Sequence, residues 1–240
     1  MNKNLAAIAV LLLVPGVYAQ SDLGQNYVQL GQSLMSTQAM NNVLANNVRA
    51  ARGGRGTANA REDTLPETSF RRIPDVTKRV EQDYADFIAK RGNPTADKEL
   101  RAYFATHDFR QDWAKNETSD GLKPDNVADA LTAYWVMNWM IANKVNGTTR
   151  AQVQAVKRQV APAILRQRAF TSLNNVGRQH LAELWQLNYL FQSIGMYGAL
   201  KKGDTAMAQK MSDAAETRFR NEAHVDLRRL KITDRGFVPA

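Results

Sequence analysis

The clearest candidates for chemistry are a histidine and a glutamate, His180 and Glu183, three positions apart. In a helix, residues at this spacing share a face. A glutamate and a histidine three apart contribute to carboxylate metal sites in helical bundles, although there the glutamate comes first. Such a site needs further ligands from facing helices, and Asp129, Glu222 and His224 are candidates. The alternative is a hydrogen-bonded polar cluster at the edge of the core.

Glu183 is also a candidate general acid. Leu181, Leu184 and Leu187 surround it in the sequence, and burial among such side chains raises the pKa of a carboxyl group. A glycosidase needs a second carboxylate across its cleft, and nothing in the sequence identifies one. Glu183 is therefore the residue to test in a hydrolase acting on wall polymers or lipids. Replacing it by glutamine is expected to abolish such activity and leave the fold intact.

Asn138 and Trp135 are further candidates for contact with a ligand or partner, and both lie in the most apolar stretch of the chain. A buried amide without a partner costs about 1 to 3 kcal/mol, so we expect Asn138 to bond to a neighbouring helix, with Asn188 as its partner. A ligand contact is the alternative. Trp135, together with Trp139 and Trp185, is expected in the core, with an aromatic ligand cage as the second interpretation.

Other catalytic classes lack the residues that they require. The chain has no cysteine and only three histidines. It contains neither the Gly-x-Ser-x-Gly turn of serine hydrolases nor a glycine-rich phosphate loop between a strand and a helix. We therefore expect no cofactor, and we favour a binding protein over an enzyme. A metal-binding helical bundle stays open as an alternative.

The first 19 residues have the three-part layout of a signal peptide. Lys3 precedes an apolar run from Leu5 to Val14, and Pro15 follows that run. The run is shorter than the roughly 20 residues that span a membrane, and we expect no transmembrane segment in the mature chain. We predict cleavage between Ala19 and Gln20, with export to the periplasm or the exterior. The absence of cysteine favours a bacterial source for an exported protein.

The charge of the chain indicates an anionic partner. The net charge is +9, and loss of residues 1–19 would leave 31 basic and 23 acidic residues, a net charge of +8. Such an excess favours association with anionic surfaces, and export makes nucleic acid a poor candidate. We expect the partner to be another envelope or exported protein, or an anionic envelope component. A toxin-immunity protein is one concrete version. The alternative is that the charge only aids solubility.

The remaining sequence divides into two parts. Residues 20–74 are rich in Gln, Asn, Ser, Gly and Arg, and we expect a flexible, partly helical segment with a linker at Arg52–Gly56. From 75 to 240, apolar residues recur at spacings of three and four. No window alternates in the manner of a strand. The predicted fold is all-α, a compact bundle of five to seven helices without a sheet.

Three stretches carry a resemblance to a known family: Asp125–Ala130 before the Trp-rich helix, Lys157–Gln159, and the ending Thr233–Pro239. Together they resemble an uncharacterised family of exported bacterial helical proteins, a "domain of unknown function", over roughly residues 70–240. The resemblance implies bacterial origin and export, and no activity or site residues. The ending itself predicts a turn, with a positive φ at Gly236 and with Phe237 docked between helices. A recognition tag is the alternative.

Overall fold

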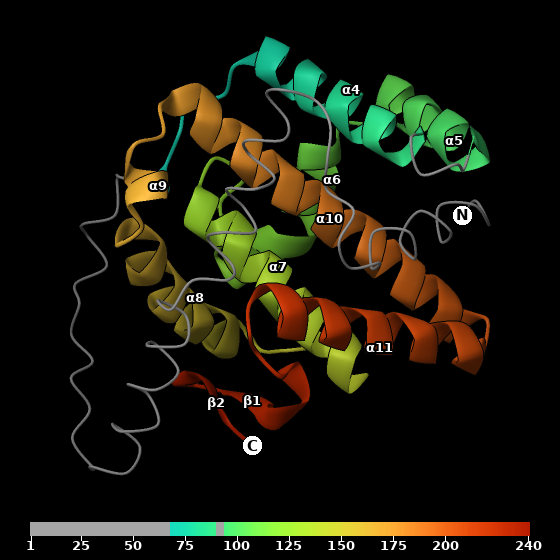
Figure 1. Cartoon of the computed structure of the whole chain (residues 1–240), viewed down its shortest axis with the longest axis vertical. Coiled ribbons are helices and arrows are strands. Elements are labelled where there is room, and N and C mark those ends of the chain that lie inside the picture. The colour runs from blue at the N-terminus through green and yellow to red at the C-terminus, as the bar shows by residue number, and fades with distance from the viewer. Residues whose placement is uncertain (1–67, 90–93) are drawn as a thin grey trace.

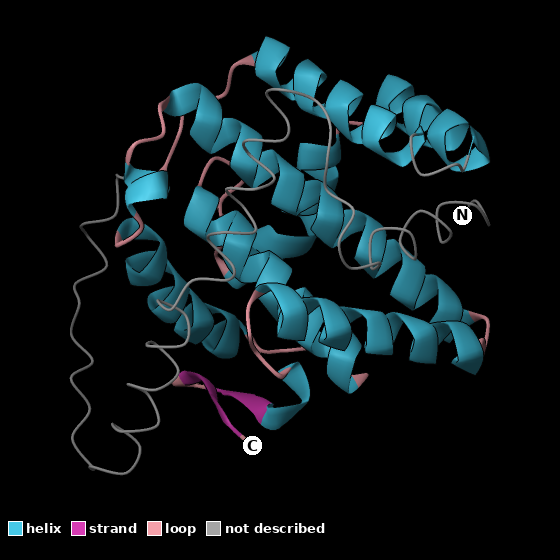
Figure 2. Cartoon of the chain, viewed as in Figure 1, coloured by secondary structure: helices cyan, strands magenta, loops and turns pink. Residues whose placement is uncertain are grey.

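The computed structural model describes residues 68–89 and 94–240, which form eight α-helices and one two-stranded sheet (Figures 1 and 2). The predicted all-α bundle is confirmed. The described residues form one helix more than the predicted five to seven, because the short α9 is a separate turn. The signal peptide and the linker at Arg52–Gly56 lie outside the described residues. The helices are α4 (Pro74–Ala89), α5 (Pro94–Thr106), α6 (Phe109–Glu117), α7 (Val127–Asn143), α8 (Arg150–Leu165), α9 (Arg168–Thr171), α10 (Asn175–Lys201) and α11 (Thr205–Glu222).

Helix α7 is the centre of the body, as its apolar sequence predicts. Asn126 caps it by accepting a hydrogen bond from Asp129 N at 3.1 Å, and almost every side chain of the helix is buried. Helices α8, α10 and α11 all pack on it. A helix that is apolar on all faces is stable in water only when it is surrounded in this way. No described helix is long and apolar enough to cross a membrane.

Helix α10 runs through the whole body, from α9 and the start of α4 to the start of α11 (Figure 1). It begins at Asn175, because α9 and a turn occupy the preceding residues and Asn174 is the cap. It ends with cations at Lys201 and Lys202, and Gly203 follows at a φ of +67°. Asp204 then caps α11.

The prediction of no sheet is wrong at the C-terminus. Strands β1 (Leu230–Thr233) and β2 (Gly236–Pro239) form an antiparallel hairpin, which lies beside α8 at the end of the chain (Figure 2). Each strand has four residues, too few to show a recognisable alternation of apolar and polar residues. The finer expectations hold, since Gly236 has a φ of +90° and the Phe237 side chain is buried.

The packed body begins before residue 75, where we placed the boundary of the helical domain. Phe70 N donates to Asp125 O at 3.0 Å, and Thr68 Oγ1 donates to Asn126 Oδ1 at 3.1 Å. Residues 68–73 therefore form a lead segment that connects α4 to the start of α7. This segment contributes directly to the cluster described next.

Candidate functional site

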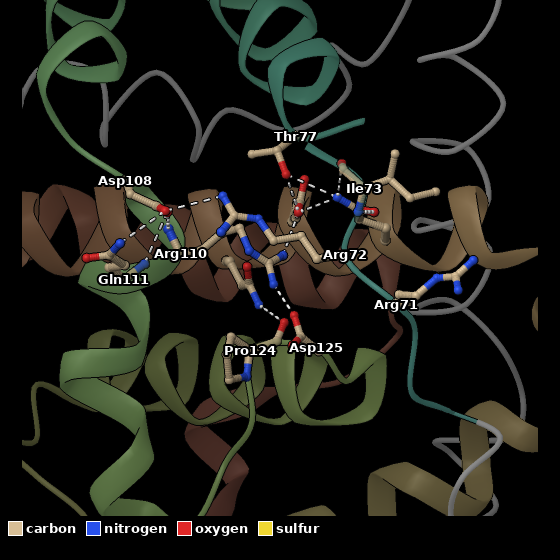
Figure 3. Close-up of polar contacts among 12 residues, drawn as sticks. Arg71, Arg72, Ile73, Thr77, Asp108, Arg110, Gln111, Pro124 and Asp125 are labelled. Carbon is tan, nitrogen blue, oxygen red and sulfur yellow. Dashed lines mark hydrogen bonds and ion pairs between the residues drawn. The ribbon is translucent and has the colours of Figure 1, made fainter. Parts of the chain in front are cut away.

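A buried ionic network joins four parts of the body around Arg110 and Glu183 (Figure 3). The two side chains are 4% and 0% exposed, and Arg110 Nη1 lies 2.5 Å from Glu183 Oε1. The same oxygen accepts hydrogen bonds from Thr77 Oγ1 at 3.0 Å and from Gln179 Nε2 at 2.9 Å. The other Arg110 nitrogen, Nη2, pairs with Asp125. The network thus connects α4, α6, α10 and the loop before α7.

Gln179 extends the network to the lead segment. Its Oε1 accepts a hydrogen bond from Ile73 N at 2.8 Å, and its Nε2 donates to Ile73 O at 2.9 Å. One side-chain amide therefore bonds to both backbone groups of Ile73, whose carbonyl oxygen also accepts from Val76 N at 3.0 Å at the start of α4. The start of α4 is fixed on α10 by this contact.

The position of Glu183 makes it a structural residue first. Burial raises its pKa, and the charge of Arg110 together with the bonds from Gln179 and Thr77 offsets part of that rise. Three donors converge on Oε1, which is the arrangement that stabilises an ionised carboxylate. A general acid must reach its substrate, whereas the Glu183 side chain has no exposed surface. Only Oε2, which has no hydrogen-bond partner in the described residues, is left for further chemistry.

A second carboxylate, Glu81, accompanies this network, and sequence reasoning missed it. It lies one turn after Thr77 on α4 and is partly exposed. Burial, and then the charges of Glu183 and Asp108, raise its pKa to about 7. The hydrolase hypothesis needs such a partner for Glu183. Nothing local in the sequence marks Glu81, because 102 positions separate it from Glu183.

The structure does not assemble His180 and Glu183 into a metal site. His180 is 2% exposed, and burial, followed by the charge of Arg79, lowers its pKa to about 4. Asp129, a suggested third ligand, instead pairs with Lys157 at 2.8 Å and accepts from Lys123 N at 2.8 Å. Within residues 68–89 and 94–240, no group of three or more His, Cys, Asp or Glu side chains could hold a metal ion.

Asn138 is fully buried and bonded to a neighbouring helix, but its predicted partner is wrong. It accepts from Arg218 of α11 and donates to Tyr134 O at 2.7 Å. Asn188 faces elsewhere and donates to Leu184 O at 2.9 Å. Both amides thus bond back to the carbonyl four residues earlier, a local option that helix spacing alone does not reveal.

Trp135 is a core residue in this structure. Its side chain is fully buried, and its ring meets the ring of Phe219 at 4.8 Å and that of Phe237 at 5.9 Å, both in edge-to-face geometry. Such pairs add to the apolar burial energy. Trp135 therefore joins α11 and the C-terminal hairpin to the central helix.

The three stretches singled out from the sequence form one connected structural unit. Asp129 pairs with Lys157, and two residues further along α8, Gln159 holds the hairpin. Gln159 Oε1 accepts from Phe237 N at 2.8 Å, and its Nε2 donates to Phe237 O at 3.1 Å. A Cβ atom on Gly236 would lie 2.4 Å from the Gln159 amide, so a larger residue there would displace that amide. These residues fix the chain end to the body.

Helical side chains also cover the free edges of the hairpin. In an exposed sheet edge, unpaired backbone groups are available to another chain. Here side chains of α7 and α8 donate hydrogen bonds to carbonyl oxygens of both strands. The C-terminal residues are therefore docked on the body, and these carbonyl groups are not available for pairing with another strand. The contacts are Trp139 Nε1 to Leu230 O at 2.8 Å, Gln152 Nε2 to Ile232 O at 3.2 Å and Gln159 Nε2 to Phe237 O at 3.1 Å.

The body is therefore an all-α bundle closed by a C-terminal hairpin. The chain belongs to a family of unknown function, DUF6683, whose model matches residues 1–239. This confirms the resemblance to an uncharacterised family, and it extends the expected coverage of about 70–240 to the N-terminal residues. No curated protein and no solved structure matches the chain.

Proposed function

We propose that the chain is an exported helical binding protein, without catalytic activity, whose partner is an anionic component of the cell envelope or an envelope protein with an acidic surface. The observation that carries this proposal is the uneven placement of charge. Between Asp129 and Glu183 the sequence has no acidic residue and seven basic ones. These are Lys144, Arg150, Lys157, Arg158, Arg166, Arg168 and Arg178.

Most of these cations lie together on one side of the body, on α8 and α9 and at the start of α10 (Figure 1). Lys157 is neutralised by Asp129. In the described part of the chain, Arg158, Arg166 and Arg168 are exposed and form no ion pair. Exposed cations without an acidic partner attract partners of the opposite charge and speed their association.

Retention of envelope material by the immobilised chain tests this proposal. Incubation with a detergent-solubilised envelope extract at low ionic strength should retain a specific component, and a salt wash should release it, because exposed charges are screened beyond about 8 Å at physiological salt. A chain of similar size and neutral charge serves as the control. Retention equal to that control would overturn the proposal.

A hydrolase is the second candidate function, and the observation that favours it is the Glu81 carboxyl group. It is partly exposed, close enough to Glu183 to be affected by its charge, and has a pKa of about 7, which suits a general acid at neutral pH. Any activity on wall polymers or lipids should disappear in Glu81→Gln. It should persist in Asp86→Asn, a control on the exposed face of the same helix. Equal activity in both variants removes this candidate.

A further inference from the structure

Four arginines lie on three segments that come together where the lead segment passes the start of α10 and α9 (Figure 1). Asn175 places the first of them, since its Oδ1 accepts from Arg71 N at 2.7 Å and its Nδ2 donates to Arg71 O at 2.8 Å. Arg178, one turn further along α10, lies over the ring of Phe170 in α9 at 5.5 Å. Arg71 is thereby held at the first residue of α10, and Arg178 lies against α9.

Arg166 and Arg168 complete the corner from the α8–α9 junction. Arg166 is the C-cap residue of α8, and Arg168 is the first residue of α9. Both side chains are exposed, as is Arg71, which points away from the Arg110 network in Figure 3. Arg178 Nε is buried without a hydrogen-bond partner in the described residues. The corner thus contains three exposed guanidinium groups and one partly buried group with a free donor.

The chemistry of this corner suits phosphate oxygens. All four cations are arginine, and the planar guanidinium group donates two parallel hydrogen bonds to a phosphate, which lysine does not do. Within the described residues, none of these four arginines forms an ion pair, and Asp75, four positions after Arg71, is not paired with it.

An apolar side chain lies on the same turn. Val176, between Asn175 and Arg178, is 40% exposed, one of four large apolar side chains with such exposure in the described residues. Basic side chains beside an exposed apolar one are the composition of surfaces that lie on anionic membranes, where the cations contact headgroups and the apolar group enters the interface. An acidic protein would not require the exposed valine.

We infer that the corner formed by Arg71, Arg166, Arg168 and Arg178, together with the exposed Val176 in the first turn of α10, binds the phosphate-bearing headgroups of an anionic lipid bilayer. This inference rests on the proposed function and gives it a location and a ligand chemistry. It assigns the attraction to one corner of the molecule rather than to the net charge of the whole chain.

Co-sedimentation of the purified full chain with vesicles of equal parts phosphatidylglycerol and phosphatidylcholine tests the inference. The decisive variant is Arg166→Gln with Arg168→Gln. Each basic residue near an anionic surface contributes about a fivefold change in partitioning at low salt, so this double variant should bind about 25-fold more weakly. The matched control is Lys201→Gln with Lys202→Gln, which removes the same charge from the other end of α10, about 40 Å away along the helix. It should lose less than about twofold.

Each outcome separates the location from the broader proposal. Equal losses in the two double variants would show that only net charge matters, which overturns the corner. Val176→Ser, which keeps the charge, should weaken vesicle binding a few-fold; no change there would overturn the role given to Val176 in the membrane interface. If wild type ignores the vesicles but still retains envelope material on a column, the lipid corner fails and the proposed function stands. If it also retains nothing, both fail.

Discussion

Replacing Glu183 by glutamine should destabilise the fold, contrary to the expectation drawn from the sequence. The variant leaves the Arg110 guanidinium buried at 4% exposure, with the half-exposed Asp125 as its one remaining acidic partner. Removing one member of a buried ion pair costs about 3 to 5 kcal/mol, because the other charge stays desolvated. Since Asp125 compensates in part, we expect the lower end, about 3 kcal/mol.

Urea and thermal unfolding of the purified chain measure this loss. For a protein of this size, about 3 kcal/mol corresponds to a fall in Tm of roughly 6 to 12 °C. Asp125→Asn is the control for an exposed partner and should cost at most about 1 kcal/mol. The double variant Arg110→Met with Glu183→Leu should recover most of the stability, because apolar groups of similar volume replace a buried pair at little cost. An unfolding free energy for Glu183→Gln within 1 kcal/mol of wild type would refute the reasoning.

Two further predictions concern His180 and the hairpin. The pKa of His180 is about 4 in the folded state, against an ordinary value of 6.5. The stability of the folded state is therefore fully present above pH 6.5 and falls as the pH drops from 6.5 towards 4, and wild type should lose about 2 kcal/mol of unfolding free energy relative to His180→Gln between pH 8 and pH 5. Parallel pH profiles of the unfolding free energy in the two proteins would contradict this. Gly236→Ala should lower the unfolding free energy more than Gly203→Ala does. Both glycines have positive φ, but a Cβ at 236 displaces the Gln159 amide, whereas nothing lies within 4 Å of a Cβ at 203. We expect about 1 to 2 kcal/mol at 203 from backbone strain and about 2 kcal/mol more at 236 from the lost hydrogen bonds; equal melting temperatures would show that Gln159 does not hold the hairpin.

The helices were predictable because their signals are local. The apolar residues of α7 can be recognised within a few positions, and the structure places them in the core as expected. The hairpin was not predictable, because its edge hydrogen bonds come from side chains of helices rather than from a wider sheet. Four-residue strands held in this way show no periodicity of their own.

The candidate site was predictable only in part, for a related reason. The leucine neighbours of Glu183 made its burial one open case, and the structure shows the side chain buried. Its partners Thr77 and Arg110 lie 106 and 73 positions away, and spacing within one helix carries no information about them. His180 shares a helix with Glu183, yet burial, followed by the charge of Arg79, lowers the pKa of His180. Spacing on one helix therefore did not bring His180 and Glu183 into one site.

The most direct test of the proposed function is the salt dependence of partner retention. The immobilised full chain should retain an envelope component at about 50 mM salt and release it progressively up to about 500 mM, as expected when exposed arginines meet an anionic partner and the Debye length shortens. A component that stays bound across this range, or an extract from which nothing is retained at low salt, would contradict the account.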